Sequence, residues 1–174
     1  MQIPDERDAE LLASYGRTRW LVTLHDRRLS LSLGDPFPVP DILPAAIVTA
    51  CNPASRLLPE HENLVANERL RRVLLEAGAS VAPALARGTG ADADLWDEPG
   101  YLVSGISLAE AVSVAASFGQ NAIVWVDRRA TPVLIATRTG FYGASSGDLL
   151  PTLRPPKENA GTQSHEERPA NGDT

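Results

Sequence analysis

Two segments in which apolar and polar residues alternate, one toward each end of the chain, constrain the fold most strongly. RWLVTLHDRRLSLSLG, residues 19–34, alternates on both sides of the polar turn HDRR. NAIVWV and PVLIATR, within residues 121–138, flank the polar turn DRRAT in the same way. A period of two on both sides of a short turn predicts a β-hairpin. Hairpins that bracket the chain at both ends disfavour a doubly wound parallel sheet, because parallel strands need long crossover connections.

Between the hairpins, the sequence predicts two further strands, each followed by a helix. AAIVTAC, residues 45–51, is short, apolar and preceded by proline, which is typical of a buried central strand. The helix after it is expected from about residue 62 to residue 77, with Gly78 ending it. YLVSGI, residues 101–106, predicts another strand, and Ser107 with Glu110 predicts a capping box for the helix that follows.

Residues 5–16 predict a first short helix, and residues 79–88 at most a weak strand. The predicted fold is therefore α+β: a single mixed, mostly antiparallel sheet with hairpins at both ends and two to three packed helices. Residues 1–147 are predicted to form this single globular domain. Residues 148–174 lose apolar side chains and gain Pro, Asn, Glu and Gly, which predicts a disordered polar tail.

Composition excludes several classes of protein. A formal net charge of −6 argues against a nucleic-acid partner, which would require clustered cations. A single cysteine excludes an intrachain disulfide and any multi-cysteine metal site, and we expect neither a metal nor a cofactor. The N-terminus is acidic without an apolar core, and no apolar run approaches the ~18 residues that span a bilayer, so a cytoplasmic location is expected. Arginine and alanine dominate over lysine, as in proteins from GC-rich bacterial genomes.

The connection TACNPASRLLPEHEN, residues 49–63, concentrates polar side chains between a strand and a helix. Pro53 is expected to hold Asn52 in extended geometry, and Asn63 to cap the helix, with Asn67 one turn further on. In one interpretation these residues only lock the loop. In the other they form a polar rim that offers amide groups to a ligand, since ligands in α/β architectures bind beyond the carboxyl ends of strands.

Two more junctions contribute candidate side chains. Glu98 precedes a strand and is the best candidate for a general base if it faces the polar rim, because desolvation would raise its pKa. Gln120 lies where a helix meets a strand and needs a polar partner when buried. Cys51 with His61 or His25 as base is the alternative nucleophilic centre, but nothing in the local spacing activates the thiol.

Four segments, in order, resemble a family. ASYGRTRW, AAIVTACNPASRLLPEHENLVANERL, WDEPGYLVSGIS and FGQNAIVW resemble the bacterial domain of unknown function DUF3293, over about residues 13–135. The resemblance implies a fold and a candidate site, with no activity to transfer. The positions that match its motifs are Thr49, Asn52, Pro53, Ser55, Asn63, Asn67, Glu98, Gly105, Phe118, Gly119, Gln120 and Ala122.

The sequence is compatible with three functions. The first is a binding or regulatory domain for a small polar ligand, a nucleotide- or amide-like metabolite. Its expected ligand-binding residues are Thr49, Asn52, Ser55, Asn63, Asn67 and Gln120. The second is a hydrolase or transferase that uses Glu98 as its catalytic residue, and the third is a protein-interaction module. Convergence of these side chains around one cavity would separate the first two from the third.

Overall fold

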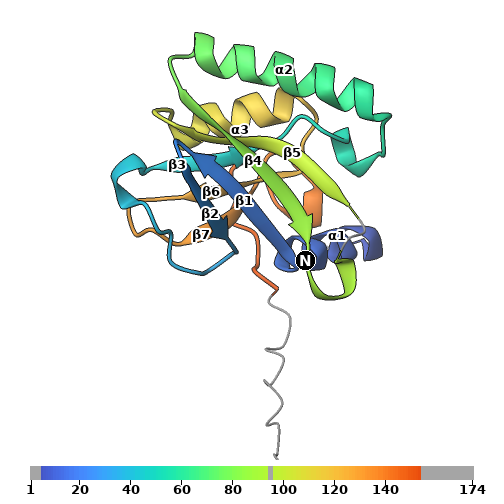
Figure 1. Cartoon of the computed structure of the whole chain (residues 1–174). Helices are drawn as coiled ribbons and strands as arrows, with labels where there is room; N and C mark the ends of the chain where they lie inside the picture. The colour runs from blue at the N-terminus through green and yellow to red at the C-terminus, as the bar shows by residue number, and fades with distance from the viewer. Residues whose placement is uncertain (1–4, 94–95, 154–174) are drawn as a thin grey trace, which may run out of the picture.

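The structure, a computed structural model, describes residues 5–93 and 96–153. Within these residues, seven strands form one antiparallel sheet in the order β2-β1-β4-β5-β3-β6-β7 (Figure 1). The two predicted hairpins, β1–β2 and β6–β7, form the two edges of this sheet. The strands are β1 Thr18–Leu24, β2 Arg27–Leu31, β3 Ala45–Val48, β4 Ser80–Gly88, β5 Asp97–Ser104, β6 Ala122–Val126 and β7 Pro132–Ala136.

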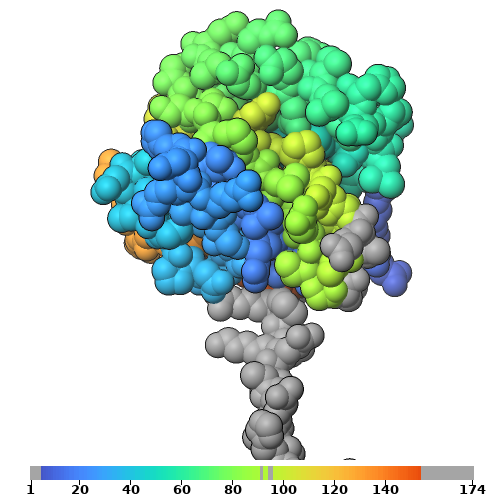
Figure 2. Space-filling view, in the orientation of Figure 1, coloured from blue at the N-terminus to red at the C-terminus, as the bar shows by residue number. Residues whose placement is uncertain are grey.

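Three α-helices among the described residues cover the two faces of the sheet. They are α1 Glu6–Gly16, α2 Glu60–Glu76 and α3 Leu108–Ser117. In Figure 1, α2 and α3 lie above the sheet and α1 lies below it, and Figure 2 shows the side chains of α2 as a cap over the strands. The predicted α+β fold with a single, mostly antiparallel sheet is thereby confirmed, and all of its strand pairs are antiparallel.

The sheet divides the hydrophobic core in two, as the period of two in its strands requires. In β3, Ala46 and Val48 face α2 and α3, while Ala45 and Ile47 face the side that carries α1. All four residues of β3 are buried because both faces of this central strand are covered. The apolar run at residues 45–48 therefore follows from its position in the middle of the sheet.

The helix ends agree with the sequence in two cases and differ in one. Ser107 and Glu110 form the predicted capping box of α3, and Gly78, at φ 81°, follows the end of α2. The prediction that Asn63 caps α2 is wrong, because α2 begins at Glu60 with Pro59 as its N-cap. Asn63 therefore lies inside the first turn of the helix, where its side chain is free to contact the loop after β3.

The segment predicted as a weak strand is β4, a nine-residue strand that pairs with both β1 and β5. Pro83 made this strand difficult to recognise, since proline cannot donate to a ladder. The proline is tolerated because the pairing of β4 with β1 starts only at Ala84. Pro99 in β5 lies similarly beyond the pairing of β5 with β3, which starts at Tyr101.

The packed chain continues past residue 147. Leu150 is 2% exposed, and its backbone N–H donates to the carbonyl oxygen of Leu134 in β7 at 2.9 Å. Leu149 forms an isolated bridge with Ile135. The first residues of the segment predicted as a tail thus add to the edge of the sheet, and residues 154–174 lie outside the described part of the chain.

Candidate functional site

A cavity of about 350 Å³ lies on the α1 side of the sheet. Its floor is formed by small residues at alternating positions of neighbouring strands: Ala84 and Ala86 of β4, Gly100 of β5 and Ala122 of β6. Because alternate residues of a strand share a face, four small side chains here leave space that larger ones would fill. Gly100 also allows the end of β3 to lie close to the backbone of β5, since a Cβ at this position would lie 2.6 Å from the carbonyl oxygen of Val48.

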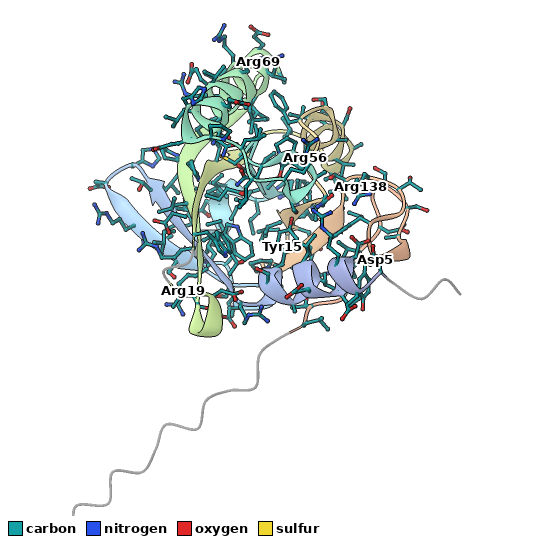
Figure 3. All side chains as sticks on the ribbon, turned by 90° about the vertical axis from the view of Figure 1, so that its right-hand side faces the viewer. Asp5, Tyr15, Arg19, Arg56, Arg69 and Arg138 are labelled. Atoms are coloured by element: carbon teal, nitrogen blue, oxygen red, sulfur yellow. The ribbon has the colours of Figure 1, made fainter. Side chains whose placement is uncertain are left out.

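The walls of the cavity combine aromatic and polar side chains. Tyr15 comes from α1, Trp20 from β1 and Trp96 from the segment before β5. Figure 3 shows Tyr15 where α1 approaches the strands. The polar lining includes side chains from β5, from the loop after β3 and from the junction between α3 and β6. These are Thr49, Asn52, Ser55, Asp97, Glu98, Gln120 and Asn121, and α1 and β1 add Ser14 and Thr18.

Glu98 and Asn52 form the central polar pair of this lining. Glu98 shares the parity of Gly100 and Leu102 along β5, so its side chain points to the cavity face of the sheet. Asn52 Nδ2 donates to Glu98 Oε2 at 3.0 Å. Among the described residues, no arginine or histidine forms an ion pair with Glu98.

The orientation of the Asn52 amide follows from its other partners. Its Oδ1 accepts from the backbone N–H of Leu58 at 3.0 Å and from Nδ2 of Asn63 at 2.9 Å. The backbone N–H of Asn52 in turn donates to Oδ1 of Asn63 at 2.9 Å. Because the Leu58 group can only donate, the Asn52 oxygen must face it, and the Asn52 amide nitrogen is thereby aimed at Glu98.

Burial raises the pKa values of two side chains that line the cavity, Glu98 and Tyr15. Loss of solvent around the carboxyl group raises the pKa of Glu98 from its usual value to about 7, against the opposing effect of the hydrogen bond from Asn52. Burial also raises the pKa of Tyr15, with a further contribution from the negative charge of Glu98. The Tyr15 hydroxyl is therefore protonated at neutral pH, while Glu98 is present in both forms.

Asn63 and Asn67 lie behind the cavity wall and do not line it. Asn67 Nδ2 donates to the carbonyl oxygen of Pro99 at 2.8 Å and to Cys51 Sγ at 3.1 Å, and its Oδ1 accepts from the N–H of Ala50. Both N–H groups of the Asn63 amide are also used, on Asn52 and on the carbonyl oxygen of Leu58. Each amide has only two N–H donors, so these two side chains hold the loop in place.

The Cys51 thiol is buried and protonated. It donates to the carbonyl oxygen of Pro99 at 3.5 Å, and burial raises its pKa. His25, in the turn of the first hairpin, and His61, in the first turn of α2, are both exposed, and neither hydrogen-bonds to Cys51. Within the ranges that the structure describes, no histidine is placed to activate the thiol.

The junction at residues 118–121 supports the loop after β3. Gln120 Nε2 donates to the carbonyl oxygen of Cys51 at 2.9 Å, and Asn121 Nδ2 donates to Ser55 Oγ at 3.0 Å. Arg138 Nε donates to Asn121 Oδ1 at 2.6 Å, which connects the end of β7 to the same wall.

The loop adopts left-handed backbone conformations that the sequence did not suggest. Asn52, Ala54 and Ser55 have φ values of 49°, 52° and 56°. The prediction of extended geometry for Asn52 is wrong: the hydrogen bonds from α2 outweigh the preference that Pro53 imposes, and asparagine tolerates the left-handed region better than most residues. Ala54 N–H donates to the carbonyl oxygen of Gly119 at 2.7 Å, which holds this strained segment against the α3–β6 junction.

The structure thus brings five of the predicted side chains to one cavity, Thr49, Asn52, Ser55, Glu98 and Gln120, and places Asn63 and Asn67 behind them. Thr49 is oriented by its hydroxyl, which donates to the carbonyl oxygen of Pro99 and accepts from the N–H of Cys51. The aromatic wall and Arg138 were not predicted. The alternating alanines of VAPALARG were the available signal for a hollow on one face of the sheet.

Within the described ranges, no three His, Cys, Asp or Glu side chains are grouped so that they would hold a metal ion. None of the helices in those ranges is both long and apolar enough to cross a membrane.

Together, fold and cavity define the class of protein: an α+β domain with a polar and aromatic cavity between one helix and an antiparallel sheet. Residues 48–123 match the family described as "Protein of unknown function (DUF3293)", which supports the resemblance seen in the sequence. Comparison with curated proteins and with solved structures gave no match.

Proposed function

We propose that this domain binds a small polar metabolite, of nucleotide or amide-bearing type, in the cavity between α1 and the sheet. The observation that carries the proposal is the Glu98 carboxyl group, which lines the cavity without a cationic partner among the described residues. A desolvated carboxyl group without a counter-charge costs stability. A ligand that hydrogen-bonds to it would offset that cost.

The shape of the cavity supports the same proposal. Its volume of about 350 Å³ lies in the range of small-molecule sites, which are mostly apolar with a few polar groups that set orientation. Here aromatic side chains supply the apolar walls, and Glu98, Asn52 and Gln120 supply the polar groups. A cytoplasmic role in a bacterial cell is part of this proposal and is supported by the composition of the chain.

A hydrolase or transferase is the second candidate, and the pKa of Glu98 favours it. A carboxyl group with a pKa of about 7 is suited to give and take protons at neutral pH. Asn52 and Gln120 each retain one N–H that is not used within the described residues, and two donors are enough to hold an oxyanion. Cys51 is not a nucleophile in this scheme.

Thermal unfolding in the presence of nucleotides, nucleosides and amide-bearing metabolites tests the proposal. A ligand at about a hundred times its Kd stabilises the folded state by about 2.7 kcal/mol, which raises the Tm by about 5–10 °C for a domain of this size. Glu98→Gln should lose this shift. Glu76→Gln, at an exposed position of α2 that does not line the cavity, should keep it. If no compound raises the Tm, the binding proposal fails and the protein-interaction alternative gains.

A second experiment separates binding from catalysis. A compound that raises the Tm is incubated with the protein and followed by NMR over several hours. Conversion of the compound to a product by the wild type but not by Glu98→Gln would establish the hydrolase or transferase function. An unchanged spectrum, with the stabilisation retained, would establish binding.

A further inference from the structure

We propose that the ligand of this cavity carries two groups at opposite ends, a planar pair of N–H donors that binds Glu98 and an anionic group that binds Arg138. This inference rests on the proposed function and specifies the chemical class of the ligand.

The Glu98 end of the cavity accepts hydrogen bonds. A carboxylate offers about four acceptor positions, and the one hydrogen bond to Glu98 within the described residues, from Asn52 Nδ2, occupies Oε2. Asn52 cannot rotate to offer its oxygen instead, because that oxygen already accepts from Leu58 and Asn63. The remaining acceptor positions of Glu98 therefore require donors, and a guanidinium or a guanine-type edge supplies two in parallel.

The walls around Glu98 suit a flat group. Tyr15, Trp20 and Trp96 line the cavity together with Glu98. Aromatic side chains pack on planar groups and attract cations through their faces. A planar donor pair, whether charged or part of a heterocycle, thus satisfies both the carboxyl group and the walls.

Arg138 is held in place beside the cavity without an acidic partner. Its Nε donates to Oδ1 of Asn121, a lining residue, and its guanidinium carbon lies 5.6 Å from the centre of the Phe141 ring. Among the described residues, no carboxylate pairs with it. A guanidinium group has five N–H donors in a planar fork, so the groups that Asn121 does not use remain available for an anion.

A second arginine follows the lining residue Ser55 in the chain. Asn121 bonds to Ser55 as well as to Arg138, so the chain at residue 55 and the Arg138 guanidinium flank the same amide. The residue after Ser55 is Arg56, which is exposed. Figure 3 labels Arg56 and Arg138 above Tyr15 and α1. Anionic groups such as phosphate or carboxylate bind to the guanidinium groups of arginines.

Two kinds of metabolite share this chemistry. An arginine-like amino acid joins a guanidinium to a carboxylate, and a guanine nucleotide joins the N1–H and N2–H edge of the base to a phosphate. The cavity volume corresponds to about twelve waters at roughly 30 Å³ each, which holds either head group with the anion at the mouth.

Calorimetric titrations with four probes test the inference and separate the two sources. Guanosine monophosphate is compared with guanosine, and arginine with agmatine, which lacks the carboxylate. In the wild-type protein, the member of a pair that carries the anion should bind about tenfold more tightly. Arg138→Gln should remove this difference and leave guanosine or agmatine unaffected. Glu98→Gln should lower the affinity for both members of each pair by a similar factor.

Arg69→Gln is the matched control, because Arg69 is an exposed arginine on α2 and lies far from Arg138 in Figure 3. It should change none of the affinities. The inference is overturned if the anion adds no affinity in either pair, if Arg138→Gln acts no differently from Arg69→Gln, or if none of the four probes binds at millimolar concentration. In that last case, a compound from the wider metabolite panel that still raises the Tm would leave the proposed function standing.

Discussion

Asn52 Nδ2 lies 3.0 Å from Oε2 of Glu98, and the same amide is held from behind by Asn63. The position of the carboxyl group in the cavity therefore depends on a loop that is 46 residues away in sequence. Asn52 connects three elements: the end of β3, the first turn of α2 and the start of β5. A change at either residue of the pair is expected to alter both stability and the properties of the cavity.

Glu98→Gln should remove most of the pH dependence of stability between pH 5 and pH 8. The folded-state pKa of about 7 lies above the ordinary value of 4.5, so the folded state binds more protons between these values. The free energy of unfolding of the wild type should therefore fall as the pH rises, by up to about 3 kcal/mol. Urea denaturation at pH 5 and pH 8 measures this difference, which the variant should not show.

Asp97→Asn is the control for that measurement. The exposed Asp97 accepts hydrogen bonds from Arg87, which lower its pKa below the ordinary value. Asp97 therefore stays ionised throughout the range from pH 5 to pH 8. The control variant should keep the wild-type dependence between pH 5 and pH 8. A slope in Glu98→Gln equal to that of the wild type would show that another group is responsible.

Asn52→Asp should destabilise the protein more at pH 8 than at pH 5. The new carboxylate would retain the acceptor contacts with Leu58 and Asn63 but would face Glu98 at the present distance of 3.0 Å. At pH 8 both groups are ionised and repel each other, whereas at pH 5 a proton can be shared between them. We expect an additional loss of about 2 kcal/mol at pH 8. Combination with Glu98→Gln should abolish this extra loss, and its persistence in the double variant would contradict the pairing.

Gly119→Ala should cost more than Gly78→Ala, although both glycines have positive φ, 72° and 81°. A Cβ at Gly119 would lie 2.8 Å from Cβ of Pro53, whereas nothing lies within 4 Å of one at Gly78. The conformational cost of about 1 kcal/mol is common to both, and the clash adds about 1–2 kcal/mol at Gly119. Chemical denaturation of the two variants gives the comparison. Equal losses would mean that the loop at residues 52–55 does not pack tightly on this junction.

Ala84→Leu should fill the cavity floor with little loss of stability, because the added methyl groups enter space that is now empty. Ala111→Leu, in the packed layer between α3 and the sheet, should destabilise by about 1–3 kcal/mol through overpacking. Both alanines are buried, at 6% and 0% exposure, so the comparison isolates the free volume next to each. Thermal unfolding distinguishes the variants. A similar large loss in both would argue against an open cavity at Ala84.

Local sequence patterns were sufficient for most of the fold. The alternation around HDRR and DRRAT predicted both hairpins, and Ser107 with Glu110 predicted the start of α3, because these signals depend on contacts between residues close in sequence. β4 was underestimated because the effect of Pro83 depends on where the neighbouring strand stops pairing. That boundary is a property of the assembled sheet.

The candidate site shows the same division. Thr49, Asn52, Ser55, Glu98 and Gln120 were recognised as polar side chains at element ends, and the structure places them on one cavity. The sequence did not show which amide side chains face the cavity and which ones hold the loop. Asn63 and Asn67 have the same side chain as Asn52, and only their partners across the fold distinguish them.

The sequence by itself determined the elements, the antiparallel class of the sheet and the set of polar residues from which a site is built. Local propensity and periodicity act over a few residues, so a single chain displays them directly. Only the tertiary structure decided the left-handed turn at Asn52, the exposed donor fork of Arg138 beside Asn121 and the hollow above Ala84 and Gly100. These features arise where segments far apart in sequence meet, because hydrogen bonds and packing formed there outweigh the local preference of each residue.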